Sequence, residues 1–296
     1  MPLIVSIARW TQPDLLARAR TDRIPQLVLI PYSNYCELAR RSLAACGEFA
    51  EISRPPLLHI LPTLALRFGS GTHVSTSSRM FGGRPGGSPT GVPVCAMPSG
   101  KVLVDSWSIL DECAQRAGWS MDGLTPELRH LLDTKLGAGA RTFAYSSLLR
   151  PECKNVWQLL LIHGQGWWWK VACRCGLADL LARRLIASFK LDDAAHMAGV
   201  RGEIDQALAE IGVLLSNTSS PFLAGARPGA ADVAIATLCA PLVFPPNYCD
   251  GKYNQLWDLL LAQDVGGRSQ VEAWRATAAG KHILKVYETF PSQAQR

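Results

Sequence analysis

The sequence predicts two domains, an α/β domain with a mixed four-stranded sheet and then an all-helical domain. Its 296 residues exceed the ~100–150 that a single ordinary core requires. Up to residue 118, short apolar runs alternate with helical patterns, whereas only long helical patterns follow residue 124. We expect an N-terminal extension over residues 1–24, the α/β domain over 25–118 and the helical domain over 125–290.

The α/β domain begins with a strand, a turn and a helix. Residues 26–31 form a short apolar run that ends at proline, which is typical of a strand buried on both faces. From Tyr35 to Cys46, apolar residues recur at helical spacing, and Gly47 ends the pattern.

The remaining elements complete the order β-α-β-α-β-β-α, which is that of the thioredoxin fold. Further strands are expected at residues 49–52, 92–96 and 101–104, and further helices at 57–68 and from 105 to about 115. A Pro98-Ser99-Gly100 turn joins the last two strands, and Gly118 closes the last helix. Residues 69–91, rich in Gly, Ser and Pro, are expected to be a flexible surface insertion.

The second domain is expected to contain helices only, with clear patterns over residues 178–189, 200–215 and 230–242. Its most apolar stretch, residues 156–175, is interrupted by polar side chains that include His163, Gln165 and Lys170, so no membrane span is predicted. Three tryptophans at 167–169 have open interpretations: an apolar co-substrate site, a membrane or partner surface, or a buried helix face.

Charge and cysteine content argue against several classes of protein. The net charge is +6, but Lys and Arg are scattered among acids instead of forming a basic stripe, so no nucleic acid partner is expected. The nine cysteines are irregularly spaced and form neither a disulfide framework nor a paired metal motif, so no metal is expected. Residues 1–23 lack a signal-peptide pattern, which predicts a cytoplasmic location, with organellar import as the alternative.

Four segments carry a recognisable pattern. Residues 31–40 read Pro-Tyr-Ser-Asn-Tyr-Cys-Glu-Leu-Ala-Arg, Gly91-Val92-Pro93-Val94 opens the third strand, and Asp105-Ser106 opens the last helix of the α/β domain. Residues 222–232 read Phe-Leu-Ala-Gly-Ala-Arg-Pro-Gly-Ala-Ala-Asp. Together with the C-terminal residues up to about 290, these segments resemble, in order, those of the glutathione transferase family.

The resemblance implies the glutathione transferase architecture, with glutathione as a substrate. In such proteins a Ser or Cys at the start of the first helix lies next to the glutathione sulfur, a position that Ser33 occupies here, with Cys36 three residues later. The resemblance also places Tyr32 in the glutathione-binding turn, and the γ-glutamyl end of glutathione at Asp105 and Ser106.

The same resemblance implies a cis peptide between Val92 and Pro93, which leaves the Val92 backbone free to pair with the cysteinyl part of glutathione. It also gives Asp232 a structural role at a helix start, although Gly229 replaces the hydroxyl residue that would complete a capping box. Two further departures are a longer loop over residues 69–91, and Leu38 and Arg41, which replace the Lys and Trp of the family branch that the C-terminal half resembles.

These residue types suit thiol activation. Glutathione is mostly protonated at neutral pH, and a Ser33 hydroxyl at a helix N-terminus could donate to the sulfur and favour the thiolate. Alternatively, Ser33 and the Asp105-Ser106 pair only cap helices. Cys36 is a mixed-disulfide nucleophile, a thiol near the helix dipole that replaces Ser33, or a buried core residue.

Three functions therefore remain open. The first is a detoxifying enzyme that conjugates glutathione to an apolar electrophile, expected to be a homodimer. The second is a redox enzyme, a glutathione-dependent thiol transferase or reductase that uses Cys36. The third is a non-catalytic binding protein with the same fold.

Overall fold

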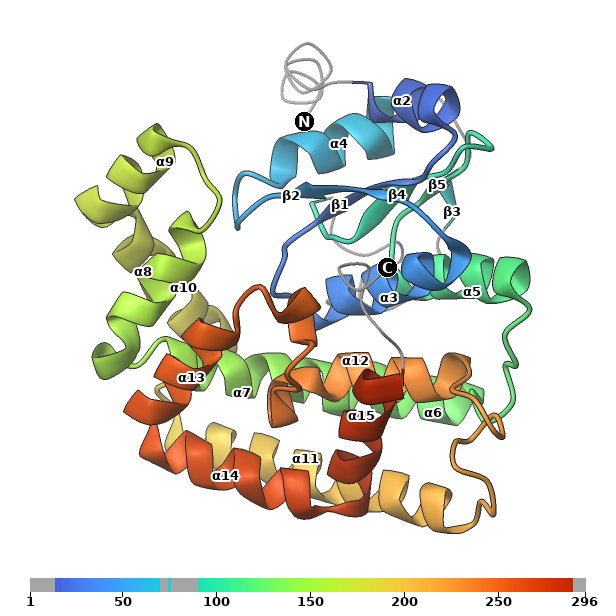
Figure 1. Cartoon of the computed structure of the whole chain (residues 1–296). Helices are drawn as coiled ribbons and strands as arrows, with labels where there is room; N and C mark the ends of the chain where they lie inside the picture. Colours follow the sequence, from blue (N-terminus) through green and yellow to red (C-terminus); the bar gives the residue numbers. More distant parts are fainter. Residues whose placement is uncertain (1–13, 70–73, 76–89, 290–296) are drawn as a thin grey trace. The chain divides into compact units, whose positions relative to one another are not determined.

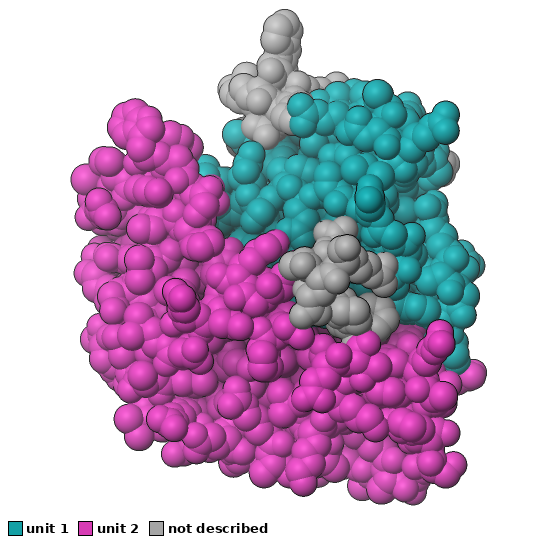
Figure 2. Space-filling model, in the orientation of Figure 1, with its two compact units in different colours: residues 1–120 teal, residues 121–296 magenta. Residues whose placement is uncertain are grey.

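The structure is a computed structural model that describes residues 14–69, 74–75 and 90–289. Two compact units make up the chain, Met1–Ser120 and Met121–Arg296 (Figure 2).

The first unit is built on a mixed sheet. Its strands lie in the order β2 (Ala50–Ser53), β1 (Gln26–Leu29), β4 (Val94–Ala96), β5 (Val102–Leu103) and β3 (Val74–Ser75). β1 is parallel to β2 and antiparallel to β4, β4 is antiparallel to β5, and β5 is parallel to β3. The predicted four-stranded mixed sheet is therefore present, with one further short strand at its edge.

That edge strand corrects part of the expected insertion at residues 69–91. Val74 pairs with Val102 and Ser75 with Leu103, so two residues of this segment belong to the sheet. A strand of only two residues gives no periodic pattern that a sequence could reveal. The neighbouring residues 70–73 and 76–89 lie outside the described part of the chain.

Helices cover both faces of the sheet, as Figure 1 shows. α3 (Asn34–Cys46) and α5 (Ser106–Ala117) lie on one face, and α2 (Leu15–Asp22) and α4 (Ile60–Gly69) lie on the other. Successive side chains of β1 point to opposite faces. Leu27 and Leu29 accordingly pack with α3 and α5, while Val28 packs with α2 and α4.

Helix α2 corrects the expectation that residues 1–24 are only an extension. Asp14 caps it by accepting a hydrogen bond from the Ala17 N–H at 2.9 Å. Leu15, Leu16 and Ala19 are buried in the core with β1 and β4. The end of this segment is therefore an integral layer of the first unit.

The second unit consists of helices. They are α6 (Pro126–Leu131), η1 (Leu132–Gly137), α7 (Ala138–Leu148), η2 (Pro151–Cys153), α8 (Lys154–Ile162), α9 (Trp167–Ala172), η3 (Cys173–Leu177), α10 (Ala178–Phe189), α11 (Ala194–Ser216), α12 (Ala230–Val243), η4 (Tyr248–Gly251), α13 (Asn254–Gln263), α14 (Val265–Ala276) and α15 (Ala278–Thr289). All 14 residues of α12 are buried, and η1, α7, α14 and α15 pack against it. α12 is thus the centre of this unit.

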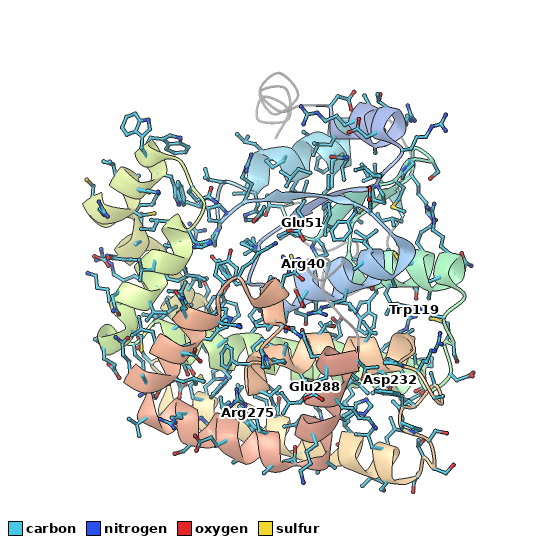
Figure 3. The ribbon with its side chains drawn as sticks, viewed as in Figure 1. Arg40, Glu51, Trp119, Asp232, Arg275 and Glu288 are labelled. Carbon is cyan, nitrogen blue, oxygen red and sulfur yellow. The ribbon has the colours of Figure 1, made fainter. Side chains whose placement is uncertain are left out.

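Polar side chains hold both ends of α12 (Figure 3). At its start, Asp232 accepts hydrogen bonds from the N–H groups of Leu223 and Gly229, both at 2.9 Å, and lies 3.0 Å from His282 Nε2. At its end, Arg275 donates to the carbonyls of the last turn, to Val243 O at 2.7 Å and to Phe244 O at 3.1 Å.

The environment of Asp232 favours its charged form. Burial opposes ionisation, but hydrogen bonds from His282 and from the Gly229 and Leu223 backbone outweigh it and hold the pKa of Asp232 below its ordinary value. Since Gly229 has no side chain, only the Asp232 half of a capping box is present.

We predict that Leu15→Ala lowers the free energy of unfolding by about 2–5 kcal/mol, because it leaves a cavity under α2. Urea unfolding followed by circular dichroism measures this. Arg18→Ala, an exposed position on the same helix, is the control and should change stability by less than about 0.5 kcal/mol. Equal small effects for both variants would show that α2 does not contribute to the core.

We predict that Asp232→Asn lowers the free energy of unfolding at pH 7 by about 1–3 kcal/mol, because it removes a charged acceptor that holds several donors. A carboxyl with a depressed pKa in the folded state stabilises the protein above its unfolded pKa, near 4, and loses this contribution as pH falls. As the pH is lowered below about 4, the free energy of unfolding should therefore fall less for the variant than for the wild type. Asp258→Asn, an exposed position on α13, is the matched control and should leave the pH profile unchanged.

Candidate functional site

Three segments of the first unit meet at one end of the strands of its sheet, just beyond the carboxyl end of β1. The turn with Ser33 follows the carboxyl end of β1. Val28 pairs with Val94 in antiparallel β4, so the residues just before β4 lie beside this end of β1. Antiparallel pairing of β4 with β5 then brings Asp105, which follows β5, to the same end of the strands. The strand register therefore brings together the three predicted glutathione-binding segments.

Ser33 occupies the N-cap position of α3 with extended backbone (φ −82°, ψ 129°), but its side chain makes no cap hydrogen bond. The side chain instead hydrogen-bonds with the sulfur of Cys36. The simple capping role considered for Ser33 is therefore not what the structure shows. Ser33 is partly exposed and lies at the positive end of the α3 dipole.

Cys36 lies in the first turn of α3 and is fully buried against Leu27, Leu29 and Ile109. Burial raises the pKa of Cys36 to about 11, and hydrogen bonds from the Ile30 backbone and Ser33 only partly oppose this. At neutral pH the side chain is a protonated thiol, which favours the core role among the alternatives for this residue.

The Val92–Pro93 peptide is cis, as the resemblance to glutathione transferases implies. Pro93 is buried and Val92 is partly buried. The ladder between β1 and β4 ends at Val94, so the Val92 backbone takes no part in the described pairing of these strands.

Asp105 caps α5. Its Oδ1 accepts from the Ser108 N–H at 2.7 Å, and its Oδ2 accepts from the Ser108 hydroxyl at 3.0 Å. Ser106, the first residue of the helix, is buried.

Arg67 is a member of the site that the sequence did not reveal. From the last turn of α4 it donates to Val104 O at 2.9 Å and to Gly91 O at 3.1 Å. The negative charge of Asp105 also acts on it. Its partners lie 37 and 24 residues away in the sequence, so no local pattern indicated these contacts.

Two further side chains lie near these segments. His59 precedes α4, and its Nδ1 lies 3.4 Å from Pro55 O. Burial lowers the pKa of His59, with hydrogen bonds to the Pro55 and Thr90 backbone opposing it, so the ring is neutral at pH 7. Tyr32, in the turn before Ser33, is partly buried.

A buried charge network supports the turn that carries Ser33 (Figure 3). Arg40 Nε lies 2.7 Å from Glu51 Oε1, and Arg40 also pairs with Glu37. Arg41, one of the departures from the family pattern, lies with its Nε 3.0 Å from Glu37 Oε1. Arg40 Nη2 donates to Pro31 O at 3.3 Å, which connects the network to the turn.

Charge pairing keeps Glu37 ionised. Burial opposes its charge, but the positive charges of Arg40 and Arg41 and their hydrogen bonds hold the pKa of Glu37 below its ordinary value.

Within the described residues there is no group of three His, Cys, Asp or Glu side chains arranged to hold a metal ion. Among the described helices, none has the length and apolar character needed to span a membrane.

Solved structures with the same architecture are glutathione transferases. The enzyme of Ceriporiopsis subvermispora superposes with a TM-score of 0.50 at 14% sequence identity, over 85% of this chain and 96% of its own. The chain has the glutathione transferase fold. The enzyme GSTFuA3 of Phanerochaete chrysosporium matches with a TM-score of 0.48 at 14% identity, over 86% of this chain and 97% of its own. By sequence, no protein-family model and no curated protein matches.

We predict that, in this glutathione transferase fold, Cys36 reacts with iodoacetamide at pH 8 about a hundredfold more slowly than Cys46. With a pKa of about 11, about one Cys36 in a thousand is a thiolate at pH 8, and its sulfur is buried. Cys46, at the other end of α3, is exposed. Pulse labelling followed by peptide mass spectrometry measures both rates in one sample, and labelling in urea serves as the control. Equal rates in the folded protein would contradict the assigned burial of Cys36.

Proposed function

We propose that the protein binds glutathione and transfers its thiolate to an electrophilic, apolar small molecule. The observation that carries this proposal is the placement of Ser33. Its hydroxyl is at the N-cap position of α3 but makes no cap hydrogen bond, and it lies at the end of the strands where Val92 and Asp105 also lie. Two facts support it: the chain has the glutathione transferase fold, and the Ceriporiopsis enzyme was solved in complex with glutathione.

The reaction needs a thiolate. In the proposed complex, the Ser33 hydroxyl turns from Cys36 to the glutathione sulfur and donates a hydrogen bond to it, while the α3 dipole favours negative charge there. The thiol proton leaves to solvent. The sulfur then forms a bond with the electrophilic carbon of the co-substrate, and the electron pair of the bond that breaks goes to the leaving group or to an adjacent acceptor.

The rest of glutathione would be held by groups of matching charge. The γ-glutamyl ammonium faces Asp105, and its carboxylate faces Ser106 and the positive N-terminal end of α5. The Val92 backbone pairs with the cysteinyl amide in the manner of an added strand, and Tyr32 lines the turn. A homodimer, a cytoplasmic location and a role in detoxification belong to the same proposal.

A redox reaction through Cys36 receives no support from the geometry. A thiol-transferase nucleophile needs an accessible sulfur with a lowered pKa, whereas Cys36 is fully buried with a raised pKa. A non-catalytic binding module with this fold is the remaining alternative, and the activity measurements below separate the two.

We predict that Ser33→Ala lowers the rate of conjugation by about ten- to a thousandfold, because it removes one hydrogen bond to a developing anion. Cys36→Ala, once shown to be folded, should retain most of the activity. Initial rates with glutathione and a panel of apolar electrophiles measure both effects, and Ser99→Ala, on the exposed hairpin turn, is the control.

Titration calorimetry with glutathione completes this test. Binding without conjugation of any electrophile would favour the non-catalytic module, and no binding at millimolar glutathione would overturn the proposal. A loss confined to Cys36→Ala would instead assign the chemistry to the cysteine.

A further inference from the structure

The helical unit exposes aromatic side chains on α9. Trp167 is 77% exposed, Trp168 is 53% exposed, and Val171, one turn after Trp167, is 49% exposed. Trp, the largest apolar side chain, is rarely left in contact with water to this extent. Figure 1 shows α9 grouped with α8 and α10 at one side of the unit.

The scaffold beneath these side chains is fixed. Trp169, the third tryptophan of the run, is buried, and its indole N–H donates to Leu161 O on α8 at 2.9 Å. Cys173, one turn further on, is also buried. The buried side of α9 is therefore anchored to α8, which leaves Trp167 and Trp168 on a firmly held outer side.

Positive charge borders the exposed aromatic rings. Lys170 and Arg174 are exposed beside them, and neither forms an ion pair with an acidic side chain among the described residues. From residue 153 to residue 178 the sequence contains no Asp or Glu. We call this surface, Trp167, Trp168, Lys170, Val171 and Arg174, the α9 surface.

The combination of exposed indole rings and neighbouring positive charge indicates which kind of partner could cover the α9 surface. Indole rings have an apolar body and a polar N–H, which suits the headgroup level of a bilayer, and neighbouring Lys and Arg are attracted to anionic lipid. A second copy of the chain fits poorly, because a symmetric contact through this surface would bring Lys170 and Arg174 against their own counterparts.

We propose that the α9 surface docks the protein on anionic lipid bilayers, with Trp167 and Trp168 entering the headgroup region and Lys170 and Arg174 pairing with lipid charges. The attachment is peripheral, because only one side of α9 is available to enter the bilayer. It is independent of the glutathione chemistry proposed above.

Co-sedimentation of the full chain with vesicles tests the proposal. With phosphatidylcholine containing about one third phosphatidylserine, we expect binding that weakens as salt is raised, and at least about tenfold weaker binding to phosphatidylcholine alone. Trp167→Ala with Trp168→Ala should weaken binding by about tenfold or more. Lys170→Gln with Arg174→Gln should weaken it by about twenty-fivefold, at about fivefold for each cation.

Matched controls remove apolar and basic side chains from exposed positions elsewhere in the unit. Val213→Ala with Val265→Ala, and Arg227→Gln with Lys281→Gln, should leave vesicle binding unchanged. Circular dichroism and glutathione calorimetry on every variant show that the fold and the other site are intact, so a failure of the transferase proposal does not affect this readout.

Several results would overturn the proposal. Absence of vesicle binding, or equal binding to neutral and anionic vesicles, would do so directly. Dimerisation that the tryptophan variant abolishes, without vesicle binding, would assign the surface to a second copy. A raised KM for an apolar electrophile in the same variant, with vesicle binding unchanged, would assign Trp167 and Trp168 to a co-substrate site.

Discussion

The first unit depends on a buried, balanced set of charges around Arg40. Two guanidinium groups, Arg40 and Arg41, face two carboxylates, Glu37 and Glu51, and three of these four side chains are at most 3% exposed. Such a set costs desolvation when it forms, but removing one member leaves an uncompensated buried charge, which typically costs about 3–5 kcal/mol. Because Arg40 also holds Pro31 O, the position of the Ser33 turn is fixed by the same charges that join α3 to β2.

Burial separates the chemistry of two neighbouring side chains. Ser33 and Cys36 are one helical turn apart and hydrogen-bond to each other, yet Ser33 is partly exposed whereas Cys36 is fully buried. The dipole of α3 acts on both, so it does not distinguish them. Solvent access and the raised pKa of the cysteine do, and they leave the hydroxyl as the group that can meet a substrate at this helix start.

Local patterns made most of the fold predictable. Spacing and turn chemistry within a few residues predicted both the helix after Ser33 and the hairpin at Pro98-Ser99-Gly100. Both occur as expected. Helix α3 ends at Cys46, and Gly100 has φ +89° and donates to Met97 O at 2.9 Å. Helix α2 was missed because its eight residues bury only Leu15, Leu16 and Ala19, too few for a periodic signal among its charged neighbours.

The candidate site was less predictable, because its supporting contacts are non-local. Arg67 joins α4 to the carbonyl of Gly91, just before Val92, and to that of Val104, just after β5. No spacing in the sequence indicates these contacts. The pairing of Arg40 with Glu51 was equally hidden, since Arg40 lies on α3 and Glu51 on β2. The sequence indicated which residues could do chemistry, but the side chains that hold them in place required the three-dimensional structure.

Helix α12 constrains how the helical unit can assemble. With every one of its 14 residues buried, it has no side that tolerates water, and an isolated helix of this length is marginal even for good helix formers. It can exist only when η1, α7, α14 and α15 are already close enough to enclose it. These segments, though separated by up to about 150 residues in sequence, must therefore form and melt as one cooperative block.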